Sequence, residues 1–109
     1  MMRVMIRDAA RQDIAERWNY SAVTWDVSQA DAYVAALDDA IMRLASKPES
    51  VPRCDWIRRG YRRLKAGSHY VFARIEGDNV IIVRVLHERM IFADHLDTKF
   101  DSDIDEGDD

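Results

Sequence analysis

Residues 58–87 read RRGYRRLKAGSHYVFARIEGDNVIIVRVLH, and this stretch decides the fold. Apolar and polar residues alternate along it with the period of two that is typical of β-strands. Turn signals that contain glycine, at 66–67 and 77–79, divide the stretch and predict three strands over residues 58–65, 68–76 and 80–87. Residues 80–83 are all β-branched, so we expect the last of these strands to be the most buried.

The alternation also assigns side chains to the two faces of the sheet. Our register is a hypothesis, because a slip of one residue would exchange the faces. It pairs Glu76 with Val80, Arg74 with Ile82, Phe72 with Arg84, His69 with His87, Arg63 with Tyr70 and Tyr61 with Phe72. The face expected to lie against helices then carries Val71, Ala73, Ile75, Ile81, Val83 and Val85. The opposite face, which we expect to be open, carries Tyr61, Arg63, Tyr70, Phe72, Arg74, Arg84 and Leu86.

The residues before Trp56 have a helical period instead. Residues 3–7 suit a short edge strand, and Asp8 is the expected N-cap of a first helix. One face of that helix, expected in the core with both of its tryptophans, carries Ala10, Ile14, Trp18, Ser21, Ala22 and Trp25.

A second helix is expected to open at Ser28, with Asp31 in a capping-box position, and to end before Pro48. Its apolar stripe is Tyr33, Leu37, Ile41 and Leu44, and a row of small residues is Ala32, Ala36 and Ala40. Small residues let helices approach closely, so we expect a hairpin with a short turn around Val27. The expected fold class is α+β: an N-terminal strand, an α-helical hairpin packed on a small antiparallel β-sheet, and a short C-terminal helical turn at 91–96.

Charge is unevenly spread over the 109 residues, whose formal net charge is −4. Residues 53–65 hold six basic residues and one acidic residue, interleaved with Trp56 and Tyr61. Such a segment favours an anionic partner, although a solvated strand surface has the same composition. Residues 101–109 hold six acids and no base, so we expect a single domain over 1–100 and a disordered acidic tail, which by its charge could cover the basic segment.

Two compositional features exclude whole classes of protein. Cys54 is the only cysteine, which rules out an internal disulfide and a cysteine zinc site and favours the reducing cytoplasm. No apolar stretch approaches the ~20 residues that cross a bilayer, so we expect no membrane partner.

An ordered set of short matches runs through residues 3–96. It comprises A-x-x-D-I at 10–14, then Trp18, Trp25, Ala32, Tyr33 and Leu37, then G-Y-R-R at 60–63, G-S-H-Y-V-F at 67–72 and R-V-L-H-E-R-M at 84–90. By this set the chain resembles the ParE branch of the ParE/RelE superfamily, the toxins of bacterial type II toxin–antitoxin pairs. The fold of that family, two helices on a small antiparallel sheet, agrees with the pattern above.

The resemblance implies a toxin that inhibits DNA gyrase by binding it, without a cofactor, a metal or chemistry of its own. It also implies a hetero-oligomer with a ParD-type antitoxin, which neutralises the toxin. Candidate contacts with the target or the antitoxin are Arg62, Arg63, Arg74, Arg84, Arg89, Tyr61 and Tyr70. Arg84 is the strongest of these, because an arginine between Val83 and Val85 must place its charge in water or against a partner. Apolar residues left over on the helical hairpin are further candidates for antitoxin contact: Tyr20, Val23, Val34 and Met42.

The alternative is a RelE-like, ribosome-dependent mRNA interferase, and nucleic acid is a partner only in that case. Cleavage at a ribose 2′-OH needs a base, a group that stabilises charge at the phosphate, and an acid. By residue type His87, Arg84 and Arg63 could supply these roles. Strict alternation argues against this alternative, because it places His87 and Arg84 on opposite faces. The other histidines complete no site, since His69 is expected to be packed and His95 lies beyond the strand.

Overall fold

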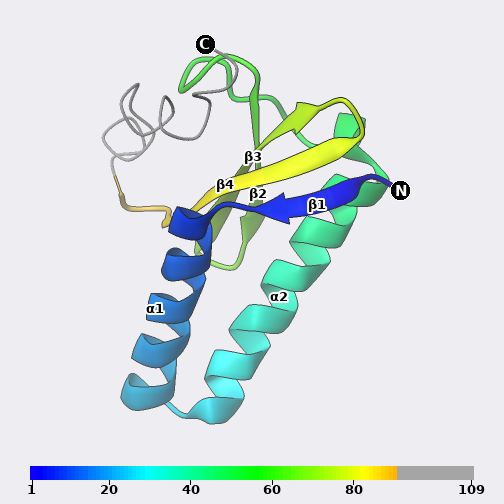
Figure 1. Ribbon diagram of the computed structural model, residues 1–109. Coiled ribbons are helices and arrows are strands. Elements are labelled where there is room, and N and C mark those ends of the chain that lie inside the picture. Colours follow the sequence, from blue (N-terminus) through cyan, green and yellow to red (C-terminus); the bar gives the residue numbers. More distant parts are fainter. Residues whose placement is uncertain (91–109) are drawn as a thin grey trace.

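The computed structural model describes residues 1–90, which form two helices and a four-stranded sheet. The elements are β1 (Arg3–Ile6), α1 (Asp8–Thr24), α2 (Val27–Ser46), the 3₁₀ turn η1 (Pro48–Ser50), β2 (Tyr61–Ala66), β3 (His69–Glu76) and β4 (Asn79–His87). The strand order is β1-β4-β3-β2, and the helices form a hairpin on one side of the sheet (Figure 1). The α+β class, the edge strand and the packed hairpin are confirmed. The sheet is mixed, because β1 runs parallel to β4. The helical turn expected at 91–96 and the tail expected at 101–109 lie outside the described residues.

Both helix caps differ from the sequence prediction, by one residue in α1 and by two residues in α2. Asp26 is the N-cap of α2, and its Oδ1 accepts a hydrogen bond from the Gln29 backbone N–H at 2.8 Å. The cap expected at Ser28 is therefore wrong. Helix α1 begins at Asp8 with Arg7 as its N-cap, so Asp8 lies inside the first turn, where a carboxylate complements the helix dipole. Helix α2 ends at Ser46, before Pro48, as expected.

The two helices contribute unequally to the core. In α2 the expected stripe is confirmed, since Leu37, Ile41 and Leu44 are buried and Tyr33 packs against them. In the expected alanine row Ala40 is buried but Ala32 is exposed. Near the start of α2 the buried alanine is Ala30, which lies outside that row. In α1 only Ala10 and Ser21 are buried.

The tryptophan prediction for α1 is half wrong. Trp18 is half-buried against α2, and its Nε1 donates to Asp31 at 3.3 Å. Trp25 follows the last residue of α1 and is 69% exposed, because the helix ends before it can return to the sheet.

Both β-hairpin turns differ from the prediction: the first lies one residue later than the expected 66–67 loop, and the second is one residue shorter than the expected 77–79 loop. Each is a two-residue loop, Gly67-Ser68 and Gly77-Asp78, with its glycine at positive φ (63° and 57°). Because Ser68 and Asp78, at the second loop position, do not have positive φ, both turns are of type II′ and not type I′. Strand β2 begins at Tyr61, not at residue 58. Because the loop after it lies one residue later than predicted, Arg63 faces Phe72 and Tyr61 faces Arg74. The predicted pairs were wrong by two residues, an even offset that leaves every β2 side chain on its predicted face.

The register between β3 and β4 was right at one end and wrong at the other. His69–His87 and Phe72–Arg84 pair as expected, but Arg74 faces Ile81 and not Ile82. A β-bulge on β4 causes this shift, because Val83 is an extra residue opposite the junction between Phe72 and Ala73 of β3. It moves Ile81 and Val83 to the face away from the helices, and Val80 and Ile82 take their places against the hairpin.

The sheet has a core on each face. Against the helices lie Val71, Ala73, Val80, Ile82 and Val85 with the stripe of α2. On the face expected to be open, a second cluster comprises Cys54, Tyr61, Phe72, Ile81, Val83 and Leu86, with Ile57 and Tyr70 packed against it. Phe72 and Leu86 are fully buried there, so the expectation of an open face is wrong for them and for Tyr61. Strand β4 is buried on both sides, as predicted from its β-branched run.

Candidate functional site

An arginine is held between two aromatic rings at the rim of the second cluster. The guanidinium carbon of Arg63 lies 4.3 Å from the ring centroid of Tyr70 and 5.1 Å from that of Trp56. Trp56 is 69% exposed, whereas Tyr70 and Arg63 are half-buried. A cation over a ring face is attracted by the ring quadrupole, and this aromatic–arginine stack presents a flat, cationic surface to solvent. Two of the predicted contact residues, Arg63 and Tyr70, thus lie together on the surface.

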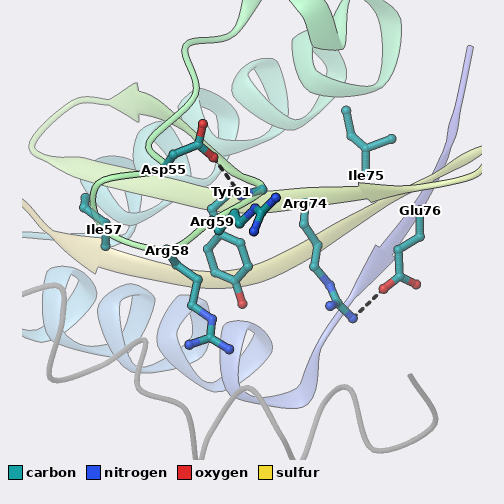
Figure 2. A pocket seen from close by; sticks show the side chains of 9 residues that line it. Asp55, Ile57, Arg58, Arg59, Tyr61, Arg74, Ile75 and Glu76 are labelled. Atoms are coloured by element: carbon teal, nitrogen blue, oxygen red, sulfur yellow. Dashed lines mark hydrogen bonds and ion pairs between the residues drawn. The ribbon is translucent and has the colours of Figure 1, made fainter. Parts of the chain in front are cut away.

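Next to the stack lies an open groove of about 610 Å³, which we call the arginine groove. Figure 2 shows Arg58, Arg59 and Arg74 on its lining, with Tyr61, Asp55 and Glu76. Arg74 pairs with Glu76 at 2.6 Å, and Asp55 is held by Arg53 at 3.0 Å and by the Gly60 backbone N–H at 2.7 Å. The pKa of the Asp55 carboxyl is lowered, first by the hydrogen bond from Arg53 and then by that from Gly60. The groove therefore combines three guanidinium groups with two carboxylates, and an anion is the ligand that its charge favours.

The remaining arginine candidates lie elsewhere. Arg62 points to the other side of β2, where its Nη1 donates to the Val51 carbonyl at 2.8 Å. Arg89 follows β4 and is exposed, and its backbone N–H donates to His87 Nδ1 at 3.0 Å. The candidate set is therefore spread over at least three places and does not form a single site.

Arg84, the strongest candidate from the sequence, is bound within the protein. Its Nε and Nη2 donate to the two carboxylate oxygens of Asp13 on α1, at 2.7 and 2.8 Å. The same carboxylate accepts the Val85 backbone N–H at 2.9 Å, so α1 caps the edge of β4 beyond the end of β1. The side chains of Arg84 and Asp13 are 18% and 12% exposed. The placement of Arg84 on an open face was wrong, because the bulge at Val83 turns the arginine toward α1.

Two histidines line a small groove between α1 and β4, of about 280 Å³, together with Asp13, Glu16, Arg17 and Tyr20. The rings of His69 and His87 stand edge to face, with centroids 5.0 Å apart, as their predicted cross-strand pairing requires. His69 is buried, and its Nε2 accepts a hydrogen bond from Arg17 Nε at 3.1 Å. Burial, then the charges of Arg17 and His87, lower the pKa of His69 to about 4. The prediction that His69 is a packed histidine is confirmed.

We expect this histidine to make the stability of the protein depend on pH. Its pKa in the folded chain is about 4, below the 6.5 of an unperturbed histidine, so between these values the unfolded chain binds more protons. The free energy of unfolding should therefore fall by up to about 3 kcal/mol as the pH drops from 7 to 4. Urea unfolding at a series of pH values measures this dependence. In a His69→Gln variant the slope above pH 5 should disappear, and an unchanged slope would contradict the assignment.

The residues proposed for RNA cleavage do not converge. His87 lies in the groove beside α1, whereas Arg63 belongs to the opposite face of the sheet. Arg84 is on the α1 side with His87, which corrects the argument from strict alternation, but its Nε and Nη2 donate to the Asp13 carboxylate. The Cys54 thiol offers no nucleophile, since it is fully buried and burial raises its pKa to about 11.

Residues 1–90 contain neither a metal-binding cluster nor a membrane-spanning helix. No three histidine, cysteine or acidic side chains in that range are placed to hold a metal ion. No helix in the same range has the length and apolarity needed to span a membrane.

The sequence did not predict the residues that pair with the candidate side chains or that line the two grooves. Asp13 stands within the A-x-x-D-I match, but its pairing with Arg84 bridges 71 positions and depends on an unforeseen bulge. Nothing in the sequence except its charge pointed to Arg17, which donates a hydrogen bond to His69. Arg58 and Arg59 belong to the basic segment 53–65, but the sequence prediction placed them in a strand. The structure places them before β2, which begins at Tyr61.

Residues 4–92 match the family described as the ParE toxin of the type II toxin–antitoxin system parDE. A protein named Toxin ParE1, from two strains of Mycobacterium tuberculosis, is 44% identical over 89 residues, which are 81% of this chain and 91% of that protein. A Toxin ParE1 from Caulobacter vibrioides is 40% identical over 87 residues, or 80% of this chain and 90% of its own length.

Solved structures agree on the fold. A chain from the chromosomal ParDE system of Pseudomonas aeruginosa superposes with a TM-score of 0.70 at 17% identity, covering 80% of this chain and 96% of that one. A chain of the RelBE2 toxin–antitoxin complex from M. tuberculosis superposes with a TM-score of 0.56 at 22% identity, covering 79% and 96%. With the family match over most of its length, the chain belongs to the ParE toxins of type II toxin–antitoxin systems.

Proposed function

We propose that this toxin inhibits DNA gyrase by binding it, without catalysis of its own. The family match and the relatives named Toxin ParE1 support this proposal. The main observation in its favour is that the candidate catalytic groups lie apart. Arg63 is stacked against two aromatic rings on one face of the sheet, whereas Arg84 is paired with the Asp13 carboxylate on the side of α1. General acid–base catalysis needs such groups within hydrogen-bond reach of one substrate.

The surface offered to the target is the aromatic–arginine stack. It combines a guanidinium with an exposed tryptophan, the residue types that dominate binding energy at protein interfaces. Truncating an arginine, tyrosine or tryptophan at the centre of an interface commonly costs more than about 1 kcal/mol of binding free energy, and about 1.4 kcal/mol is a tenfold change in affinity. Arg63 and Tyr70 are therefore the predicted residues whose surroundings best support a role in target binding.

A supercoiling and DNA-cleavage assay with purified gyrase tests the proposal. The antitoxin-free toxin should abolish supercoiling and cause cleaved DNA to accumulate. Arg63→Ala should raise the half-inhibitory concentration roughly tenfold, whereas Arg11→Ala, an exposed arginine of α1, should leave it unchanged. No inhibition by folded toxin would refute the gyrase target, and ribosome-dependent mRNA cleavage by the same sample would favour the alternative.

The antitoxin of this toxin is, in our proposal, of the ParD type. An apolar groove of about 400 Å³ where β1, α1 and α2 meet supports it, lined in part by Ile6, Ile14, Trp18 and Val34. Such a groove suits the apolar face of an amphipathic helix. Of the other predicted contacts, Tyr20, Val23 and Met42 are exposed on the same hairpin. A ParD-type antitoxin should restore supercoiling in the assay above, and we place the pair in the cytoplasm, in keeping with the lone cysteine.

A further inference from the structure

The charge of the described protein is divided between its two layers. Residues 8–46, which contain the helical hairpin, carry three basic and seven acidic residues. Residues 47–90, which contain β2, β3 and β4 with their loops, carry ten basic and five acidic residues. An anionic segment is therefore repelled by the hairpin layer and attracted to the sheet layer.

Within the sheet layer the attraction is strongest on the side away from the helices. The arginine groove brings Arg58, Arg59 and Arg74 to one open concavity, and the aromatic–arginine stack adds Arg63 beside it. Lys65 lies over the same Tyr70 ring, 5.9 Å from its centroid. This face gathers arginines, whose planar forks bind carboxylates in pairs of hydrogen bonds.

The chain itself supplies a matching anion. Residues 101–109, DSDIDEGDD, contain six carboxylates and no base, and they lie beyond residue 92, where the family match ends. The groove lies near the end of the sheet where β4 begins, because Ile75 and Glu76 line it and pair with Val80 and Asn79. β4 spans about 26 Å at 3.3 Å per residue, and the ten residues 91–100 can span up to about 33 Å. The tail can therefore reach the arginine groove from the end of β4.

We propose that the acidic tail, residues 101–109, docks on the arginine groove of its own chain. In this arrangement the tail carboxylates pair with the guanidinium groups of Arg58 and Arg59, and the tail screens the basic face from other anionic ligands. Any polyanion that uses this face must first displace the tail. The inference rests on charge and reach alone, and does not depend on which target the toxin has.

Paramagnetic relaxation in the full-length chain tests the docking directly. A nitroxide is attached to an Asp108→Cys variant, in which the native Cys54 remains unlabelled because it is fully buried and its thiol pKa is raised to about 11. At about 0.05 M salt the backbone amides of residues 58–60 and 74–76 should lose more than half of their intensity. At about 1 M salt, where the Debye length is about 3 Å, these signals should recover.

Two matched pairs of variants distinguish docking from chance proximity. Arg58→Glu with Arg59→Glu should abolish the loss of intensity, whereas Arg11→Glu with Arg43→Glu, the same charge change at exposed positions of the hairpin layer, should not. In the labelled Asp108→Cys chain, replacing the five remaining tail acids by their amides leaves residues 1–90 unchanged in sequence and should also abolish the effect. Loss of intensity on α1 or α2, uniform loss, or no loss at low salt would each overturn the proposal.

Discussion

The Phe72→Ala variant is expected to lose about 3–5 kcal/mol of unfolding free energy. Phe72 is fully buried in the second cluster, to which Cys54 and Ile57 contribute from the segment before β2. Truncating it removes the transfer free energy of a benzyl group and leaves a cavity that its neighbours fill only in part. A domain of this size has a total stability of about 5–15 kcal/mol, so the loss is a large share.

Equilibrium urea unfolding measures this effect, with two comparisons. Trp56→Ala removes a larger ring from the same face, but that ring is 69% exposed, so its cost should stay within about 1 kcal/mol, the worth of an exposed cation–π contact. If Phe72→Ala does not fold, Phe72→Leu replaces it in the comparison, because leucine keeps most of the side-chain volume. If Phe72→Ala costs no more than Trp56→Ala, the face is open and the second core does not exist.

Asp13→Ala is expected to lower the free energy of unfolding by about 3 kcal/mol. From the sequence alone, Asp13 would be taken for an ordinary surface residue of a helix. Its carboxylate accepts two hydrogen bonds from Arg84 and one from the Val85 backbone N–H, and the ion pair is less than one fifth exposed. Removing one partner leaves a nearly buried cation and a backbone donor without the acceptor that they had.

A double-mutant cycle separates the ion pair from the other effects. Combining Asp13→Ala with Arg84→Met should recover part of the stability, because no uncompensated charge then remains. Glu88→Ala breaks an exposed pair with Lys65 and should cause little change, since screening by water weakens such pairs. Equal losses from Asp13→Ala and Glu88→Ala would contradict the role assigned to Asp13.

Local signals predicted the elements of this fold well. Alternation and glycine turns indicated β2, β3 and β4, and the period of the apolar residues indicated the stripe of α2. These patterns depend on neighbours within a few residues, where backbone geometry alone decides which side chains share a face. The cap of α2 was missed by two residues because Asp26 and Ser28 are both good N-cap residue types, and only the hydrogen bond from the Gln29 backbone N–H to Asp26 distinguishes them.

The assignment of faces on β4 failed for a different reason. A run such as residues 80–83 is apolar on both sides, so its alternation carries no information about which side meets the helices. The bulge at Val83 then reversed half of the strand at no cost in burial, since both faces of the sheet are covered. The candidate site inherited that error, because the direction of Arg84 follows from the bulge.

The parallel pairing of β1 with β4 has a consequence for how the toxin is made. Arg3 to Ile6 pair with Asn79 to Ile82, so the first strand synthesised must wait for the last before its hydrogen bonds can form. Closing so long a loop costs entropy before any contact offsets it, and such non-local topologies fold slowly. A ribosome must therefore translate nearly the whole domain before the sheet can close, and a nascent chain that stops short of β4 carries no folded toxin.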